Sequence, residues 1–129
     1  MKLLLLVHGA TWDRRYQASA LAASATALGD RVDVALFFGA LDAWVKKEWD
    51  RLDPAPPLTA ERIDAVAFPP LSSLLDGARA TGLLKLYGCS ASARLLGLDP
   101  AHCLTRLDTL AGWPTFAQKI AEADRVVGF

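Results

Sequence analysis

Short runs of apolar residues recur along the chain, with charged and small residues between them. Apolar runs of about four to eight residues are typical of strands that are covered on both faces of a sheet. The pattern predicts such strands at residues 3–7, 32–38 and 83–87, and a terminal strand at 126–129. A further short strand is expected within residues 104–108, although Arg106 interrupts the apolar pattern there.

Between the first runs, apolar residues repeat at helical spacing. Asp13 is expected to cap the first helix and Gly29 to end it, because aspartate favours the start of a helix and glycine the end. Asp42 is expected to cap a second, short helix that carries Trp49 on its apolar face.

Helical patterns continue in the second half of the chain. A helix is predicted at residues 71–82, a single turn at Asp99-Pro100, and a last helix that Pro114 opens. The apolar stripe of this last helix is formed by Trp113, Phe116, Ala117, Ile120 and Ala121.

The alternation of strands and helices predicts an α/β fold with three α/β/α layers and a parallel sheet of about five strands. We expect one domain over residues 1–129. Residues 53–70 are rich in proline and predict a surface excursion with a short helix within 59–66. This excursion is either a plain connector or a flap over a site.

Composition limits the kinds of partner and the cellular compartment that we expect for this protein. The chain has a formal net charge of zero and no run of Lys or Arg, which argues against nucleic acid and against a polybasic membrane surface. The apolar run at the N-terminus stops at His8, well short of a membrane span or a signal peptide. Two cysteines make no disulfide framework, so we expect a cytoplasmic protein with reduced thiols. Four tryptophans in a small chain favour a homo-oligomer.

The carboxyl ends of the predicted strands are the expected place for a site, because ligands of open parallel sheets collect there. These ends carry His8-Gly9, Gly39, Gly88-Cys89-Ser90 and the region of Asp108. Cys89 follows a buried strand and opens a helix, whose free N–H groups can stabilise a thiolate. The thiol of Cys89 is therefore either a nucleophile or a small apolar core residue.

The spacing of the cysteines limits the chemistry of Cys89. Four residues separate Cys89 from Arg94, where the phosphatase and rhodanese-type loops need five, and the chain has no C-x-x-C motif. A thiol peroxidase would need Cys103 as the resolving partner, although Cys103 is expected to be structural.

Two histidines complete the residues with possible chemistry. His8 either carries a proton to and from the site or is a hydrogen-bonded residue at a strand end, and His102 is expected in solvent. The His and Cys residues lack the spacing of a zinc site, so no metal is expected. The chain has no glycine-rich phosphate loop, so no nucleotide cofactor is expected either. Residues Gly9, Gly39, Gly88 and Ser90 are predicted to line the substrate site.

The segment Leu86-Tyr87-Gly88-Cys89-Ser90-Ala91-Ser92-Ala93, within residues 71–97, resembles the cysteine segment of the DsrE/DsrF-like family, which includes the TusD-type sulfur-relay subunits. The apolar first strand with its alanine-rich helix and the closing residues 123–129 fit the same family. The resemblance implies a flavodoxin-like domain that assembles into trimers or hexamers. It also implies that Cys89 accepts sulfane sulfur as a persulfide and passes it on to an acceptor.

The leading hypothesis is therefore a small cytoplasmic sulfur carrier or sulfurtransferase with Cys89 and His8 as its reactive residues. Its partners would be sulfur donor and acceptor proteins or small thiols. The alternatives are a non-catalytic oligomeric binding or scaffold protein with a structural cysteine, and a thiol peroxidase.

Overall fold

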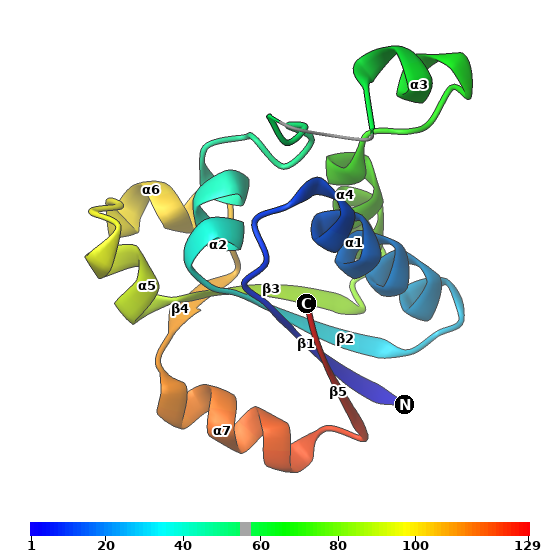
Figure 1. The fold of residues 1–129 in the computed structure, drawn as a ribbon. Helices are drawn as coiled ribbons and strands as arrows, with labels where there is room; N and C mark the ends of the chain where they lie inside the picture. The colour runs from blue at the N-terminus through cyan, green and yellow to red at the C-terminus, as the bar shows by residue number, and fades with distance from the viewer. Residues whose placement is uncertain (55–57) are drawn as a thin grey trace.

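The computed structural model describes residues 1–54 and 58–129, and it has a single parallel sheet with helices on both faces (Figure 1). The strands are β1 (Lys2–Val7), β2 (Arg31–Leu36), β3 (Leu84–Cys89), β4 (Thr109–Ala111) and β5 (Arg125–Gly128). The helices are α1 (Trp12–Ala27), α2 (Phe38–Val45), α3 (Ala60–Ala65), α4 (Leu71–Ala80), α5 (Ser90–Leu95), α6 (Pro100–Leu104) and α7 (Trp113–Glu122). The predicted three-layer α/β/α fold with five parallel strands is confirmed.

The strand order, β4-β3-β2-β1-β5, explains why the two faces of the sheet are covered unequally. Strands β1 to β4 follow one another toward one edge, so right-handed crossovers place α1, α2 and α4 on the same face. The chain then returns to the opposite edge for β5, and the same handedness requires α7 to cross the other face. Figure 1 shows α7 alone on its side of the sheet, opposite α1, α2 and α4.

Two apolar clusters result, because successive strand residues point to opposite faces. The main cluster joins residues such as Leu5, Val34 and Leu86 of the strands to α1, α2 and α4. The second cluster lies between the sheet and α7. It consists of Ala35, Phe37, Tyr87, Cys89 and Phe116, with Leu6 and Ala111 packed against it.

The expectation of a strand within 104–108 is wrong. Leu104 ends α6, and β4 begins only at Thr109. Asp108 therefore lies before the amino end of β4, where its carboxylate accepts a hydrogen bond from the Leu86 N–H at 2.6 Å. A strand of three residues is too short to show a periodic pattern, which is why the sequence misplaced it.

Two helix starts also differ from their prediction. Helix α2 begins at Phe38 rather than at Asp42, so Gly39 lies inside the helix instead of ending a strand. It ends at Val45, so Trp49 lies beyond the helix that was expected to carry it. The aromatic pair before Gly39 resembles the end of a strand, and this similarity hid the start of the helix. The N-cap residue of α1 is Thr11, and Asp13 lies in the first turn.

The excursion at 53–70 contains the expected short helix, α3, whose cap residue Thr59 accepts a hydrogen bond from the Arg62 N–H at 3.3 Å. Phe68, at the end of the excursion, packs on the rings of Trp12 and Tyr16 of α1, with ring centroids 6.1 Å and 5.7 Å apart. Residues 55–57 of the predicted proline-rich segment lie outside the described residues. None of the described helices is long and apolar enough to cross a bilayer.

Candidate functional site at the Cys89 turn

Cys89 occupies the junction between β3 and α5. It is the last residue of the strand and the N-cap residue of the helix, with extended backbone angles (φ −74°, ψ 118°). Its Sγ accepts a hydrogen bond from the backbone N–H of Ser92 at 3.5 Å. The sulfur therefore meets one of the free donors of the first turn of a helix, as the strand-turn-helix pattern predicted.

The sulfur is also well covered. Cys89 is 2% exposed and belongs to the second apolar cluster, beneath the N-terminal half of α7. The ring of Phe37 lies 5.2 Å from that of Phe116 and 5.3 Å from that of Trp113, so aromatic groups roof this part of the sheet. A reagent that reaches Cys89 has to displace part of this roof.

The surroundings of the turn carry exposed aromatic groups. Trp113 is 51% exposed and Phe38 is 47% exposed. Phe38 has a φ of +42°, in the left-handed region that side chains rarely adopt, and such strain is often found at functional sites. Ser90 lies against the start of α7, since a Cβ on Gly112 would sit 3.8 Å from the Ser90 Oγ. Phe38 follows Phe37 of the second cluster directly, and Trp113 stacks on the Phe37 ring, so both exposed rings lie next to the cluster that contains Cys89.

Gly88 has a packing reason of its own. A Cβ at this position would lie 2.6 Å from Leu107 Cδ1 and 3.0 Å from side-chain carbons of Leu41 and Leu110. Glycine thus allows the leucines of the main cluster to close against β3 beside Cys89. The role of Gly88 and Ser90 in substrate binding remains a prediction.

Gly9 and Gly39 belong to the neighbouring loops at the same edge. A Cβ on Gly39 would lie 2.7 Å from the Cβ of Ala10, and one on Gly9 would lie 2.2 Å from Arg14 Cδ. Both glycines let the loop after β1 pack closely against its surroundings. The role of Gly9 and Gly39 in substrate binding remains a prediction.

His8 lies at the carboxyl end of β1 and is exposed. Its backbone N–H donates to the carbonyl of Phe129 at 2.9 Å, and no hydrogen bond among the described residues involves its imidazole. Strand β2 separates β1 from β3, so two strand spacings, about 10 Å, lie between His8 and Cys89 along the sheet. The two residues share an edge without direct contact between their strands.

Cys103 belongs to a different environment. It lies in α6, is fully buried, and packs in the main cluster, whereas Cys89 packs in the second cluster. Burial raises the pKa of the Cys103 thiol, and the nearby carboxylate of Asp99 raises it further. Both cysteines are free. A Cys89–Cys103 disulfide, as a peroxidase would need, finds no support in this arrangement.

Sequence reasoning missed a buried arginine that organises the edge. Arg15 is 1% exposed, and its guanidinium donates to the carbonyls of Trp49 at 2.8 Å, of Ala10 and of Arg51. Burial lowers the pKa of Arg15, while the carboxylate of Asp53 opposes that shift. Arg15 thus ties the loop after β1 to the segment after α2. The sequence did hold a signal for the burial of Arg15, because it lies three and four residues before Ala18 and Ser19 and therefore on the same face of α1.

Two comparisons with known proteins bear on this site. The model of the DsrE/DsrF-like family matches residues 1–129, the whole chain. A comparison with curated proteins gives no match. Among the described residues, no three His, Cys, Asp or Glu side chains come together as a metal site would require.

Proposed function

Because the chain belongs to the DsrE/DsrF-like family, which is generally related to sulfur relay, we propose that it carries sulfane sulfur as a persulfide on Cys89. The observation that carries this proposal is the position of the sulfur at the β3–α5 turn, with the Ser92 N–H as donor at 3.5 Å. A backbone donor stabilises the thiolate form that attacks a sulfane sulfur, and it costs no reorganisation when the charge develops.

The transfer consists of two displacements. In the first, the Cys89 thiolate attacks the terminal sulfur of a donor persulfide, a new S–S bond forms, the donor's own S–S bond breaks, and the donor leaves as a thiolate. In the second, an acceptor thiolate attacks the outer sulfur of the Cys89 persulfide and restores the Cys89 thiolate. Electrons balance in each exchange, so no external oxidant or reductant is needed.

The remaining parts of the proposal concern the edge and its partners. The exposed rings of Trp113 and Phe38 mark the side from which a donor or acceptor thiol, of a protein or a small molecule, would approach. His8 would take up the proton of an arriving thiol at the same edge, through water rather than by contact with Cys89. A cytoplasmic location and a homo-oligomer, a trimer or hexamer, also belong to this proposal.

Mass spectrometry of the intact protein after incubation with inorganic polysulfide tests the proposal. We expect one added sulfur atom on the parent protein and on a Cys103→Ser variant, removable by dithiothreitol, and none on Cys89→Ser. Equal loading of Cys89→Ser and the parent would refute the assignment. The Cys103→Ser variant is the matched control, because it also replaces one buried thiol.

One observation favours a second candidate, a binding or scaffold protein whose cysteine only packs. Cys89 is 2% exposed and sits among aromatic rings, as structural cysteines do. This candidate predicts that the folded protein resists alkylation at Cys89 and gains no sulfur from polysulfide. The same mass spectrometry therefore separates the two functions.

A further inference from the structure

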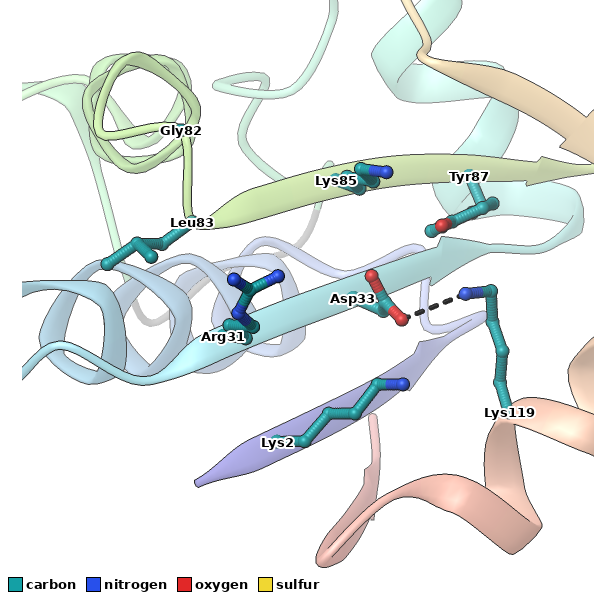
Figure 2. Close-up of a pocket in the computed structure, with 8 residues that line it drawn as sticks. All are labelled: Lys2, Arg31, Asp33, Gly82, Leu83, Lys85, Tyr87 and Lys119. Carbon is teal, nitrogen blue, oxygen red and sulfur yellow. Dashed lines mark hydrogen bonds and ion pairs between the residues drawn. The ribbon is translucent and has the colours of Figure 1, made fainter.

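Helix α7 leaves part of its sheet face open. Phe116 packs over the carboxyl half of the sheet, and Glu122, at the last turn, pairs with Lys2 of β1 at 3.4 Å. The amino ends of β2 and β3 lie beside the line that α7 follows across the sheet, and α7 does not cover them. A cavity of about 160 Å³ occupies the uncovered area (Figure 2).

Charged side chains from four different elements face this cavity. Lys2 pairs in register with Arg31, and Asp33 with Lys85, so the three strands present these residues on one face. Lys119 of α7 completes the wall, and Figure 2 shows all five charged side chains around the same hollow. The cavity thus holds four cationic groups and one carboxylate.

The one carboxylate already has a partner. Lys119 Nζ lies 3.0 Å from the carboxylate of Asp33, and the two side chains are only 17% and 14% exposed. Lys119 Nζ also lies 4.4 Å from the centre of the Tyr87 ring. Burial lowers the pKa of Lys119, but its interactions with Tyr87 and Asp33 outweigh burial and raise the pKa above its usual value. Asp33 is therefore neutralised by a group that stays charged.

The other cations lack such a partner. Within residues 1–54 and 58–129, no carboxylate lies within salt-bridge distance of Arg31 or Lys85. The pair of Lys2 with Glu122 is exposed, and exposed pairs of this length are weak. The chain as a whole has no net charge, so this excess of positive charge is a local feature. The like charges around this cavity repel one another, and a bound anion would offset that repulsion.

We propose that this cavity binds a small tetrahedral oxyanion, held by the guanidinium of Arg31 and the ammonium groups of Lys85 and Lys2. A guanidinium offers paired donors that fit two oxygens of such an anion, and ammonium groups add point charges from the other sides. The volume, about 160 Å³, is well below the roughly 300–1,000 Å³ of pockets for larger ligands. The ligand is thus a phosphate group or a sulfur oxyanion rather than a nucleotide.

The cavity lies on the same sheet face as Cys89. Lys85, Tyr87 and Cys89 alternate along β3, so the Tyr87 ring stands between the anion site and the covered sulfur. The two sites nevertheless have separate polar groups. The anion site does not rest on persulfide chemistry, and binding measured in a Cys89→Ser variant keeps the two proposals apart.

Thermal unfolding in phosphate, in thiosulfate and in chloride at constant ionic strength tests the site. A ligand that binds only the folded state raises the melting temperature by an amount that grows with the ratio of its free concentration to its dissociation constant. Because kosmotropic anions such as phosphate also stabilise folded proteins without a site, the shift is compared with that of Arg31→Ala/Lys85→Ala. We expect phosphate or thiosulfate, relative to chloride, to raise the melting temperature of the parent more than that of this variant, and the salt with the larger difference between the two proteins indicates the preferred oxyanion. Equal shifts in the two proteins would overturn the proposal.

Paired variants locate the binding. Arg31→Ala/Lys85→Ala removes two exposed cations of the cavity and should weaken binding by calorimetry about tenfold or more. Arg62→Ala/Arg94→Ala removes two exposed cations outside the cavity and should bind as the parent does. Equal weakening in both pairs would show that only general charge matters and would refute the site.

A single variant tests whether the removal of negative charge from the cavity strengthens anion binding. Asp33→Asn removes the only carboxylate among the described residues that line the cavity and frees Lys119 for the anion, so phosphate should bind several-fold more tightly. Weaker or unchanged binding by Asp33→Asn would contradict the proposed arrangement.

Discussion

Ser92 and Ser19 are both fully buried, yet they differ in the hydrogen bonds of their hydroxyl groups. The Oγ of Ser19 donates to the Arg15 carbonyl at 2.7 Å and accepts from Trp49 Nε1 at 2.9 Å. The Oγ of Ser92 is the one buried side-chain nitrogen or oxygen atom among the described residues that has no hydrogen-bond partner. Only the backbone N–H of Ser92 acts on Cys89, so its hydroxyl has no part in the proposed chemistry.

This contrast predicts opposite effects for the same substitution. Ser92→Ala should leave the free energy of unfolding unchanged or raise it by about 1 kcal/mol, because an unsatisfied buried hydroxyl is lost. Ser19→Ala should lower it by about 1–3 kcal/mol, because the Trp49 indole N–H loses its acceptor. Urea unfolding measures both free energies, provided that the dependence of the free energy on urea concentration has the same slope in the variants and the parent. A loss in Ser92→Ala as large as that in Ser19→Ala would show that the Ser92 hydroxyl is satisfied in solution.

At the scale of elements, α7 is held to the sheet by few contacts. The predicted stripe of this helix has one buried member, Phe116, while Trp113 and Ile120 are 51% and 39% exposed. The prediction that this stripe is buried is wrong beyond Phe116, because the sheet under the second half of α7 carries polar groups, including Asp33. An element with few buried contacts opens locally more easily than the rest of the fold. Opening of α7 is thus the expected route to Cys89.

Replacing the anchor of α7 should expose the sulfur. Phe116→Ala removes the ring that covers the second cluster, and we expect iodoacetamide to label Cys89 at least about tenfold faster than in the parent, since each 1.4 kcal/mol of easier opening gives a factor of ten. Deleting such a ring costs about 3–5 kcal/mol, so Phe116→Leu serves as a milder variant if the alanine form unfolds.

Ile120→Ala is the matched control on the same helix. Its side chain is 39% exposed, so labelling of Cys89 should stay close to the parent rate. Circular dichroism checks that each variant remains folded. An unchanged labelling rate in folded Phe116 variants would mean that Cys89 is reached by another path.

At the scale of the whole molecule, the sequence identified the elements whose patterns are strong. Strands β1, β2 and β3 are covered by helices over the whole of one face and over the carboxyl half of the other, and their largely apolar runs predicted them to within two residues. Strand β4 has only three residues, and α2 starts at a residue with positive φ, so neither had a pattern to recognise. The prediction failed where the element was short or its backbone unusual.

The position of the Cys89 site was predictable from the sequence, but the residues that surround it were not. A strand followed by small helix-forming residues placed Cys89 at the carboxyl edge. Which face it points to depends on strand register and on the return of the chain through α7, and a shift of one residue would reverse the face. The roof of aromatic rings and the separation of Cys89 from Cys103 follow from that face, so a linear pattern could not supply them.

Cys103 connects this arrangement to the stability of the whole molecule. Its thiol is fully buried, and its pKa is raised above the ordinary value of 9.0, first by burial and then by Asp99. Well below pH 9 the thiol is neutral in both the folded and the unfolded chain. Above it, the unfolded chain releases the proton and the folded chain keeps it, so stability is lost as pH rises toward the folded pKa.

The free energy of unfolding should therefore fall between pH 9 and 10, and Cys103 should contribute up to about 1.4 kcal/mol of that fall. Cys103→Ala leaves a small cavity and lowers stability at every pH, but it removes this part of the slope, because alanine has no proton to release. Urea unfolding at pH 8, 9 and 10 gives the slope for each protein. Equal slopes would mean that the Cys103 thiol ionises as readily in the folded chain as in the unfolded one, which a sulfur enclosed in the main cluster should not do.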